Sequence, residues 1–212
     1  MTLVERAESV RRFAMLSIAA QLCLTAAAWL LPLFSEFHFT DDTISELALG
    51  RFGYLQTAAF VIAGGGTLVL ARAIERMTIP SRASVSGVRL IYFYGVAIVL
   101  LGVFPTEEID APMEIWSQGT VGLLHAWIST LAFPAAVIGM VLLTLAFRNQ
   151  ARWRPISNGS GACAALALAL LFVQSEGPLI GLMRRLLVGV ISAWLILVAL
   201  RIRTTIAPRR AG

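Results

Sequence analysis

Few side chains in this sequence could do chemistry, and most of them lie within or beside long apolar segments. His125, one of only two histidines, lies about five residues into the apolar segment Thr120–Phe147. At a helical rise of ~1.5 Å per residue, this is roughly 8 Å from the start of the segment. An ionisable group inside an apolar segment is energetically expensive, and it therefore indicates a functional site.

Other polar residues fall at a similar level near the ends of neighbouring apolar segments. Gln56 lies about one turn into the second segment, below Arg51, and Glu107 ends the third. Arg184 and Arg185 lie near the start of the sixth. We expect these side chains to converge on one outward-facing polar pocket. The predicted ligand-binding set is Ser45, Glu46, Arg51, Gln56, Glu107, His125, Gln174, Glu176 and Arg185.

The same residues allow a catalytic and a structural interpretation. In a catalytic role, His125 is the general base and Glu46 or Glu107 its partner, and a base must lie within ~3 Å of the proton that it removes. We treat these three as candidates and assign no catalytic residue. In a structural role, His125 is neutral and bonded to a carbonyl or to a glutamine, and ion pairs tie the helix ends together. The arginines of those pairs are Arg51, Arg184 and Arg185, and the acids are Glu46, Glu107 and Glu176.

The sequence does not favour a metal or a cofactor. His38 and His125 are the two histidines, and neither has a second ligand three or four residues away. Ser45, His125 and Asp42 formally supply a Ser–His–Asp set, but there is no G-x-S-x-G sequence. We therefore expect no metal site and no cofactor.

The elements that must position these residues are helices that cross a membrane. The chain has 212 residues, of which 58% are hydrophobic and 14% charged, and its mean hydropathy is +0.81. A typical soluble domain is about a quarter charged. A helix needs ~20 apolar residues to cross a bilayer. The apolar residues gather in six segments, at about Phe13–Phe34, Gly53–Ile74, Val88–Phe104, Thr120–Phe147, Gly159–Gln174 and Leu179–Ile202. The predicted fold is all-α, a polytopic bundle of six transmembrane helices in one domain.

The arginines predict how this bundle is oriented. If the loops between the segments are assigned alternately to two sides, one side holds only Arg51, Arg184 and Arg185 of the 17 basic residues. Short loops rich in arginine stay in the cytoplasm. Both termini are therefore expected in the cytoplasm, with a lead at 1–12, a membrane domain at 13–203 and a basic tail at 204–212.

The net charge of +5 and the pI near 10.2 do not predict nucleic-acid binding. The arginines are divided among short segments next to the bilayer, where they favour anionic lipid headgroups. Membrane lipids are thus the expected partners. Gly161, Ala165 and Ala169 recur every four residues and predict a helix-packing face, through which the chain could also oligomerise.

Four short motifs occur in a fixed order along the chain. They are Ile44–Leu47 (Ile-Ser-Glu-Leu), Gly102–Glu107 (Gly-Val-Phe-Pro-Thr-Glu), the lone His125, and Gly181–Arg185 (Gly-Leu-Met-Arg-Arg). With six short-looped segments, this order resembles the bacterial membrane family called domain of unknown function 998, over roughly residues 12–203. The resemblance implies the fold and topology and names no reaction. Arg184 occupies a position that is often Glu or Gln in the family.

The expected protein is a multi-pass protein of the bacterial inner membrane. Its expected function is to bind or sense a lipid or small amphiphile in the outward-facing pocket. Two alternatives stay open: an enzyme that acts on a lipid or isoprenoid with His125 as base, and a structural subunit of a membrane complex.

Overall fold

The computed structural model describes residues 3–107, 119–173 and 178–206, and these form helices and no strand. Two short 3-10 helices lie between the first two long helices, η1 (Leu31–Phe34) and η2 (Glu46–Ala48), and a third, η4 (Arg154–Ile156), precedes α5. The long helices are α1 (Leu3–Leu30), α2 (Gly53–Met77), α3 (Arg82–Val103), α4 (Thr120–Arg148), α5 (Ser157–Phe172) and α6 (Ile180–Ile206).

Within the described residues, six helical segments are long and apolar enough to cross a membrane, the fifth of them formed by η4 and α5 together, which confirms the predicted all-α fold with six spans. The predicted helix ends are less accurate. Helix α1 begins at Leu3, ten residues before the predicted Phe13, and α3 begins at Arg82 rather than Val88. Hydropathy marks the part of a helix that lies in hydrocarbon, whereas its end is set by capping. Ser81 caps α3 by accepting a hydrogen bond from the backbone N–H of Ser84.

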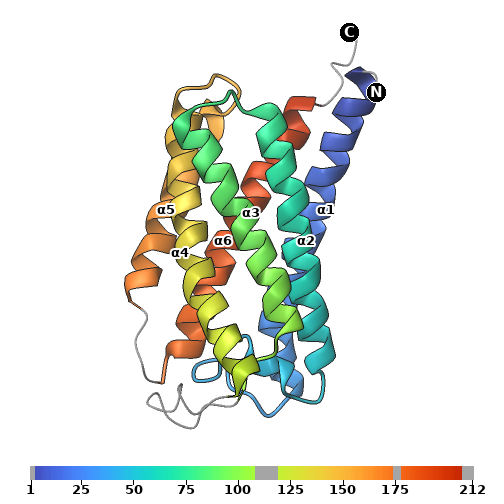
Figure 1. The fold of residues 1–212 in the computed structure, drawn as a ribbon, viewed down its shortest axis with the longest axis vertical. Coiled ribbons are helices and arrows are strands. Elements are labelled where there is room, and N and C mark those ends of the chain that lie inside the picture. Colours follow the sequence, from blue (N-terminus) through green and yellow to red (C-terminus); the bar gives the residue numbers. More distant parts are fainter. Residues whose placement is uncertain (1–2, 108–118, 174–177, 207–212) are drawn as a thin grey trace.

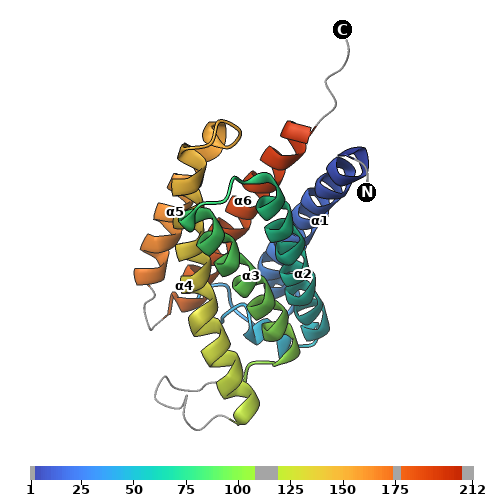
Figure 2. The same ribbon diagram turned by 45° about the horizontal axis from the view of Figure 1, so that its top comes forward.

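The helices pack in sequence order, each against the next, and α6 closes the bundle (Figures 1 and 2). Helix α6 runs behind α3 in Figure 1 and packs between α1 and α5. It contributes several fully buried side chains, including Trp194, Leu195, Val198 and Ile202. Helix α1 begins and helix α6 ends at the same end of the bundle, which is called the termini end here. Helices α2, α4 and α6 all begin at the opposite end (Figure 1).

Glycines let α3 approach both of its neighbours at backbone distance. A Cβ atom added to Gly64 on α2 would lie 2.7 Å from the carbonyl oxygen of Gly95 on α3. On the other side of α3, a Cβ at Gly87 would lie 3.2 Å from the carbonyl oxygen of Gly139 on α4. Small residues allow this kind of close helix contact where lipid surrounds the protein. By contrast, Ala165 and Ala169 on α5 are exposed.

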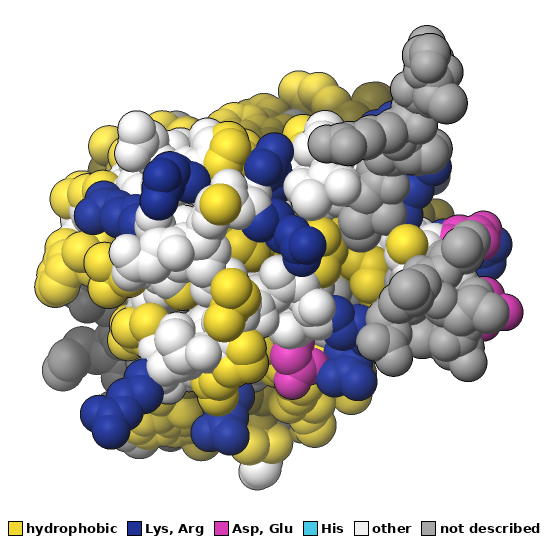
Figure 3. Space-filling view, turned by 90° about the horizontal axis from the view of Figure 1, so that it is seen from above, with side chains coloured by type: hydrophobic (Ala, Val, Ile, Leu, Met, Phe, Trp, Pro, Cys, Tyr) yellow, Lys and Arg dark blue, Asp and Glu magenta, His cyan; other side chains and the backbone are white. Residues whose placement is uncertain are grey.

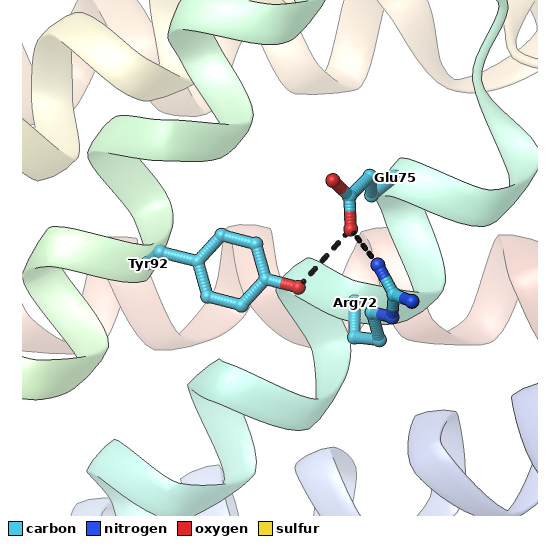
Figure 4. Close-up of polar contacts among 3 residues, drawn as sticks. All are labelled: Arg72, Glu75 and Tyr92. Atoms are coloured by element: carbon cyan, nitrogen blue, oxygen red, sulfur yellow. Dashed lines mark hydrogen bonds and ion pairs between the residues drawn. The ribbon is translucent and has the colours of Figure 1, made fainter.

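The termini end carries most of the arginines. Figure 3 looks onto this end and shows basic side chains spread over it, with few acidic ones. Some of these arginines contact residues of other segments, as Arg76 does with Ser9 and Arg152 with Met77, and others make local contacts. Arg72 pairs with Glu75, whose carboxylate also accepts a hydrogen bond from the Tyr92 hydroxyl at 3.3 Å (Figure 4). Gln150 binds both the N–H and the carbonyl of Ile79, so it joins the α2–α3 and α4–α5 connections.

Candidate functional site

Arg185 is the most deeply buried charged residue at the opposite end of the bundle, with 1% of its surface exposed. Its Nε donates to the carbonyl of Ala28 at 3.1 Å, and its Nη1 donates to the carbonyls of Phe39 and Asp42. The guanidinium also lies 5.8 Å from the centre of the Phe39 ring. Arg185 therefore fixes the chain that follows α1 against the start of α6.

Gly181 makes this attachment possible. A Cβ at this position would lie 2.3 Å from the carbonyl oxygen of Asp42 and 2.8 Å from that of Thr40. With no side chain in the way, the backbone N–H of Leu182 donates to Thr40 at 3.1 Å. The Gly-Leu-Met-Arg-Arg motif therefore attaches the loop between α1 and α2 to the start of α6. Its glycine allows the approach, its leucine supplies an N–H, and its second arginine binds the carbonyls.

Not all donors of the two arginines are used. Among the described residues, the Nη2 of Arg185 and the Nε of Arg184 are buried without a hydrogen-bond partner. Glu46 is near enough to act electrostatically on both arginines, and Asp42 acts on Arg185, but neither acid pairs with them. Two ion pairs of the described residues, Arg12–Glu8 and Arg72–Glu75, lie at the termini end.

The carboxylates bind backbone N–H groups instead. Glu107 accepts hydrogen bonds from Gly119 at 2.8 Å and from Gly122 at 3.3 Å, so it caps the start of α4. Glu46 accepts a hydrogen bond from the backbone N–H of Thr43. The predicted pairing of Arg184 and Arg185 with these acids is therefore not formed.

His125 is 5% exposed and faces the inside of the bundle from α4. Its Nδ1 lies 2.7 Å from the carbonyl oxygen of Phe104. A carbonyl can only accept, so Nδ1 carries a proton, and in the neutral ring the lone pair is on Nε2. Arg184 lies within electrostatic range of the imidazole. This bond to a carbonyl agrees with the structural interpretation, and it also leaves Nε2 for chemistry.

Gln56 is fully buried on α2, and neither atom of its amide has a partner among the described residues. It lies on the stripe of α2 that also carries Phe60, Ala63 and Thr67. Gln56 lies within the first six residues of α2, His125 within those of α4, and Arg184 and Arg185 within those of α6. We call these four the buried polar layer.

The remaining predicted site residues fall elsewhere. Arg51 is exposed, with its guanidinium 5.4 Å from the centre of the Phe52 ring. Ser45 forms a hydrogen bond with the hydroxyl of Thr43. Gln174 and Glu176 lie outside the described residues.

Two buried hydrogen-bond clusters were not predicted. In the first, Gln21 of α1 donates to the carbonyl of Ala63 and the hydroxyl of Thr67 on α2, and it accepts from Ser192 of α6. In the second, Ser160 of α5 binds Thr144 of α4 at 2.6 Å and Trp194 of α6 at 2.7 Å. Gln21, a polar residue in the middle of the first apolar segment, was the sequence feature that could have indicated the first cluster. These clusters join helices and place no ionisable group.

Two hollows of about 480 and 270 Å³ open at the termini end. The larger lies between the α2–α3 connection and the end of α4, and the smaller lies between α1 and α6. Neither is lined by the buried polar layer. The outward-facing pocket therefore stays a prediction.

Within the described residues, no three His, Cys, Asp or Glu side chains are placed to hold a metal ion together.

Comparison with known proteins gives a family but no close relative. Residues 17–201 match the family described as protein of unknown function DUF998. No curated protein and no solved structure matches the chain. The match covers most of the sequence and includes all four motifs that carried the resemblance. The chain therefore belongs to the DUF998 family.

Proposed function

We propose that this protein lies in the bacterial inner membrane with both termini in the cytoplasm, and that its buried polar layer binds the headgroup of a lipid or small amphiphile. The observation that supports this proposal is that Arg184 and Arg185 each have a buried N–H donor without a hydrogen-bond partner among the described residues. A buried donor without a partner destabilises a protein by about 1–3 kcal/mol, and more when it is charged. A ligand that accepts these hydrogen bonds would remove that penalty.

The depth of the layer supports a headgroup as the occupant. Gln56 is the fourth residue of its helix, and His125 and Arg185 are each the sixth of theirs. At ~1.5 Å per residue, these positions lie within roughly 8 Å of the helix ends. A bilayer adds a few ångströms of headgroup region on each side of its ~30 Å hydrocarbon core, so the layer falls near this boundary.

The orientation rests on the arginines of the termini end, since short arginine-rich loops stay cytoplasmic. A reporter enzyme that is active only in the periplasm, fused after Gly212, is expected to be inactive. The same reporter inserted after Arg51 is expected to be active. The reverse pattern would overturn the orientation.

The binding proposal is tested by lipid co-purification. The protein is extracted in a mild maltoside detergent, and bound molecules are identified by native mass spectrometry and lipid analysis. We expect a bound amphiphile with the wild-type chain and its loss with Arg184→Gln. Arg51→Gln is the matched control, because it removes an outer arginine that lies outside the layer. Equal retention by all three proteins would contradict the proposal.

One observation favours an enzyme as the second candidate. The Phe104 carbonyl fixes the tautomer of His125 and leaves the Nε2 lone pair available, as a general base requires. Conversion of a bound lipid or isoprenoid over time, abolished by His125→Asn, would establish this function. A bound molecule of unchanged mass would favour simple binding.

A further inference from the structure

We infer that the group bound by the buried polar layer is an oxygen anion, either a carboxylate or a phosphate. This inference rests on the proposed function, because it names the chemical class of the same ligand. Two observations support it. Most of the buried atoms of the layer without a partner among the described residues are hydrogen-bond donors, and the neighbouring carboxylates bind other groups.

Four side-chain atoms of the layer are buried without a partner among the described residues, and three of them are donors, whereas the fourth, the amide oxygen of Gln56, is an acceptor. Arg185 donates hydrogen bonds from Nε and Nη1 to three carbonyls, and its Nη2 is buried without a partner. The Nε of Arg184 and the amide nitrogen of Gln56 are also buried and unpaired among the described residues. Guanidinium groups donate only, so the missing partner of each must be an acceptor. Hydrogen bonds from arginine to anionic oxygens are about twice as strong as those between neutral groups.

The protein's own acceptors do not meet this need. The carboxylate of Glu46 binds Thr43, and that of Asp42 binds the backbone N–H of His38. Both stabilise the loop between α1 and α2, although they stand within electrostatic range of the arginines. The carbonyls of Ala28, Phe39 and Asp42 are already bound to Arg185. An external oxygen anion can therefore add acceptors without breaking the loop.

Glu46 supplies a test of the sign of the ligand's charge. Its carboxylate acts electrostatically on Arg184 and Arg185, so it would repel an anion bound between them. Glu46→Gln removes this charge and keeps an oxygen that can accept from Thr43. For an anion, Glu46→Gln is expected to strengthen binding and Arg184→Gln to weaken it. A cationic ligand would reverse both signs.

The experiment uses the full-length protein in nanodiscs of zwitterionic lipid. Four probes of defined chemistry are added, namely dodecyl phosphate, laurate, dodecanol and inorganic phosphate. Binding is measured by native mass spectrometry and by the rise in thermal unfolding temperature. We expect dodecyl phosphate or laurate to bind and dodecanol not to bind. Arg184→Gln should weaken binding by about tenfold or more, and Glu46→Gln should strengthen it severalfold.

The outcomes separate this inference from the proposed function. Equal binding of dodecanol and the two anionic amphiphiles would overturn the anion while keeping amphiphile binding. Inorganic phosphate binding as tightly as dodecyl phosphate would support the anion and contradict an amphiphile. No binding of any probe would overturn both. Arg185→Lys is a second variant, because it keeps the charge but loses the planar fork, and it should reduce binding of the anions even where the fold is retained.

Discussion

Arg72 lies at the surface near the termini end, one turn from Glu75, whereas Arg185 is buried at the opposite end among three backbone carbonyls. Exposed charges of the first kind are screened by water and contribute little to stability. A buried guanidinium of the second kind has lost its hydration, so each of its donors that lacks a partner destabilises the protein. The comparison teaches that a surface arginine such as Arg72 contacts a neighbour on its own helix, whereas Arg185 joins separate segments inside the protein.

The largest effect is expected from removing the buried member of this comparison. Arg185→Met should lower the free energy of unfolding by about 3–5 kcal/mol, since it leaves three carbonyls unbound and weakens the attachment of the loop to α6. The measurement is thermal or denaturant unfolding in detergent. Arg152→Met is the control at the termini end, where Arg152 is exposed and binds the single carbonyl of Met77. Similar losses for the two variants would abolish the distinction between the two ends.

A glycine pair tests whether the loop must approach α6 closely. Gly181→Ala would place a Cβ 2.3 Å from the carbonyl oxygen of Asp42, so a destabilisation of about 1–3 kcal/mol is expected. Gly189→Ala, two turns further along the same helix, meets nothing within 4 Å. Alanine has the higher helix propensity, and this variant should be unchanged or up to about 1 kcal/mol more stable. A tolerated Gly181→Ala would show that the loop can shift.

Two buried glutamines separate structural from functional polarity. Gln21→Leu breaks hydrogen bonds to α2 and α6 and should destabilise the protein by about 1 kcal/mol. Gln56→Leu removes an amide with no partner, so stability should be unchanged or increased, while ligand binding falls. Unfolding and probe binding measured on both variants check this. A strongly destabilised Gln56→Leu would mean that the amide serves the fold.

The smallest effect is expected at the exposed pair shown in Figure 4. Glu75→Gln removes the charge that contacts Arg72 and Tyr92, yet these groups face water or headgroups. No measurable change in the unfolding temperature is expected, at low or at high salt. A clear loss that disappears at high salt would show that the termini end also depends on specific ion pairs.

The sequence predicts the helices well because membrane spans leave a long apolar signal. His125, Gln56 and Arg185 lie near the starts of α4, α2 and α6, whereas their convergence on one site stays a prediction. The sequence does not predict what they bind. The partners of Arg185 and His125 are backbone carbonyls, which every residue has and no residue type marks. The Gln21 cluster was missed for a related reason, since one uncharged polar residue hardly changes the hydropathy of its segment.

The expected ion pairs of Glu46 and Glu107 do not form, for a physical reason that is visible only in three dimensions. Glu107 lies just before the start of α4 in space, although 12 residues separate it from Gly119 in the chain. The unsatisfied N–H groups of a helix start attract a carboxylate strongly. The same applies to Glu46 and the turn at Thr43. Glu46 and Glu107, which were expected to pair with arginines, therefore bind backbone N–H groups instead.

The attachment of the first loop to the last helix also has a consequence for biosynthesis. Arg185 binds carbonyls that precede it by 143 to 157 residues. Ser192 binds Gln21 across 171 residues. A nascent chain that ends before α6 has neither contact, so the loop between α1 and α2 lacks these attachments until translation is almost complete. The loop after α1 is therefore attached to α6 only when the last helix has been made. A truncated chain would expose that loop to proteases.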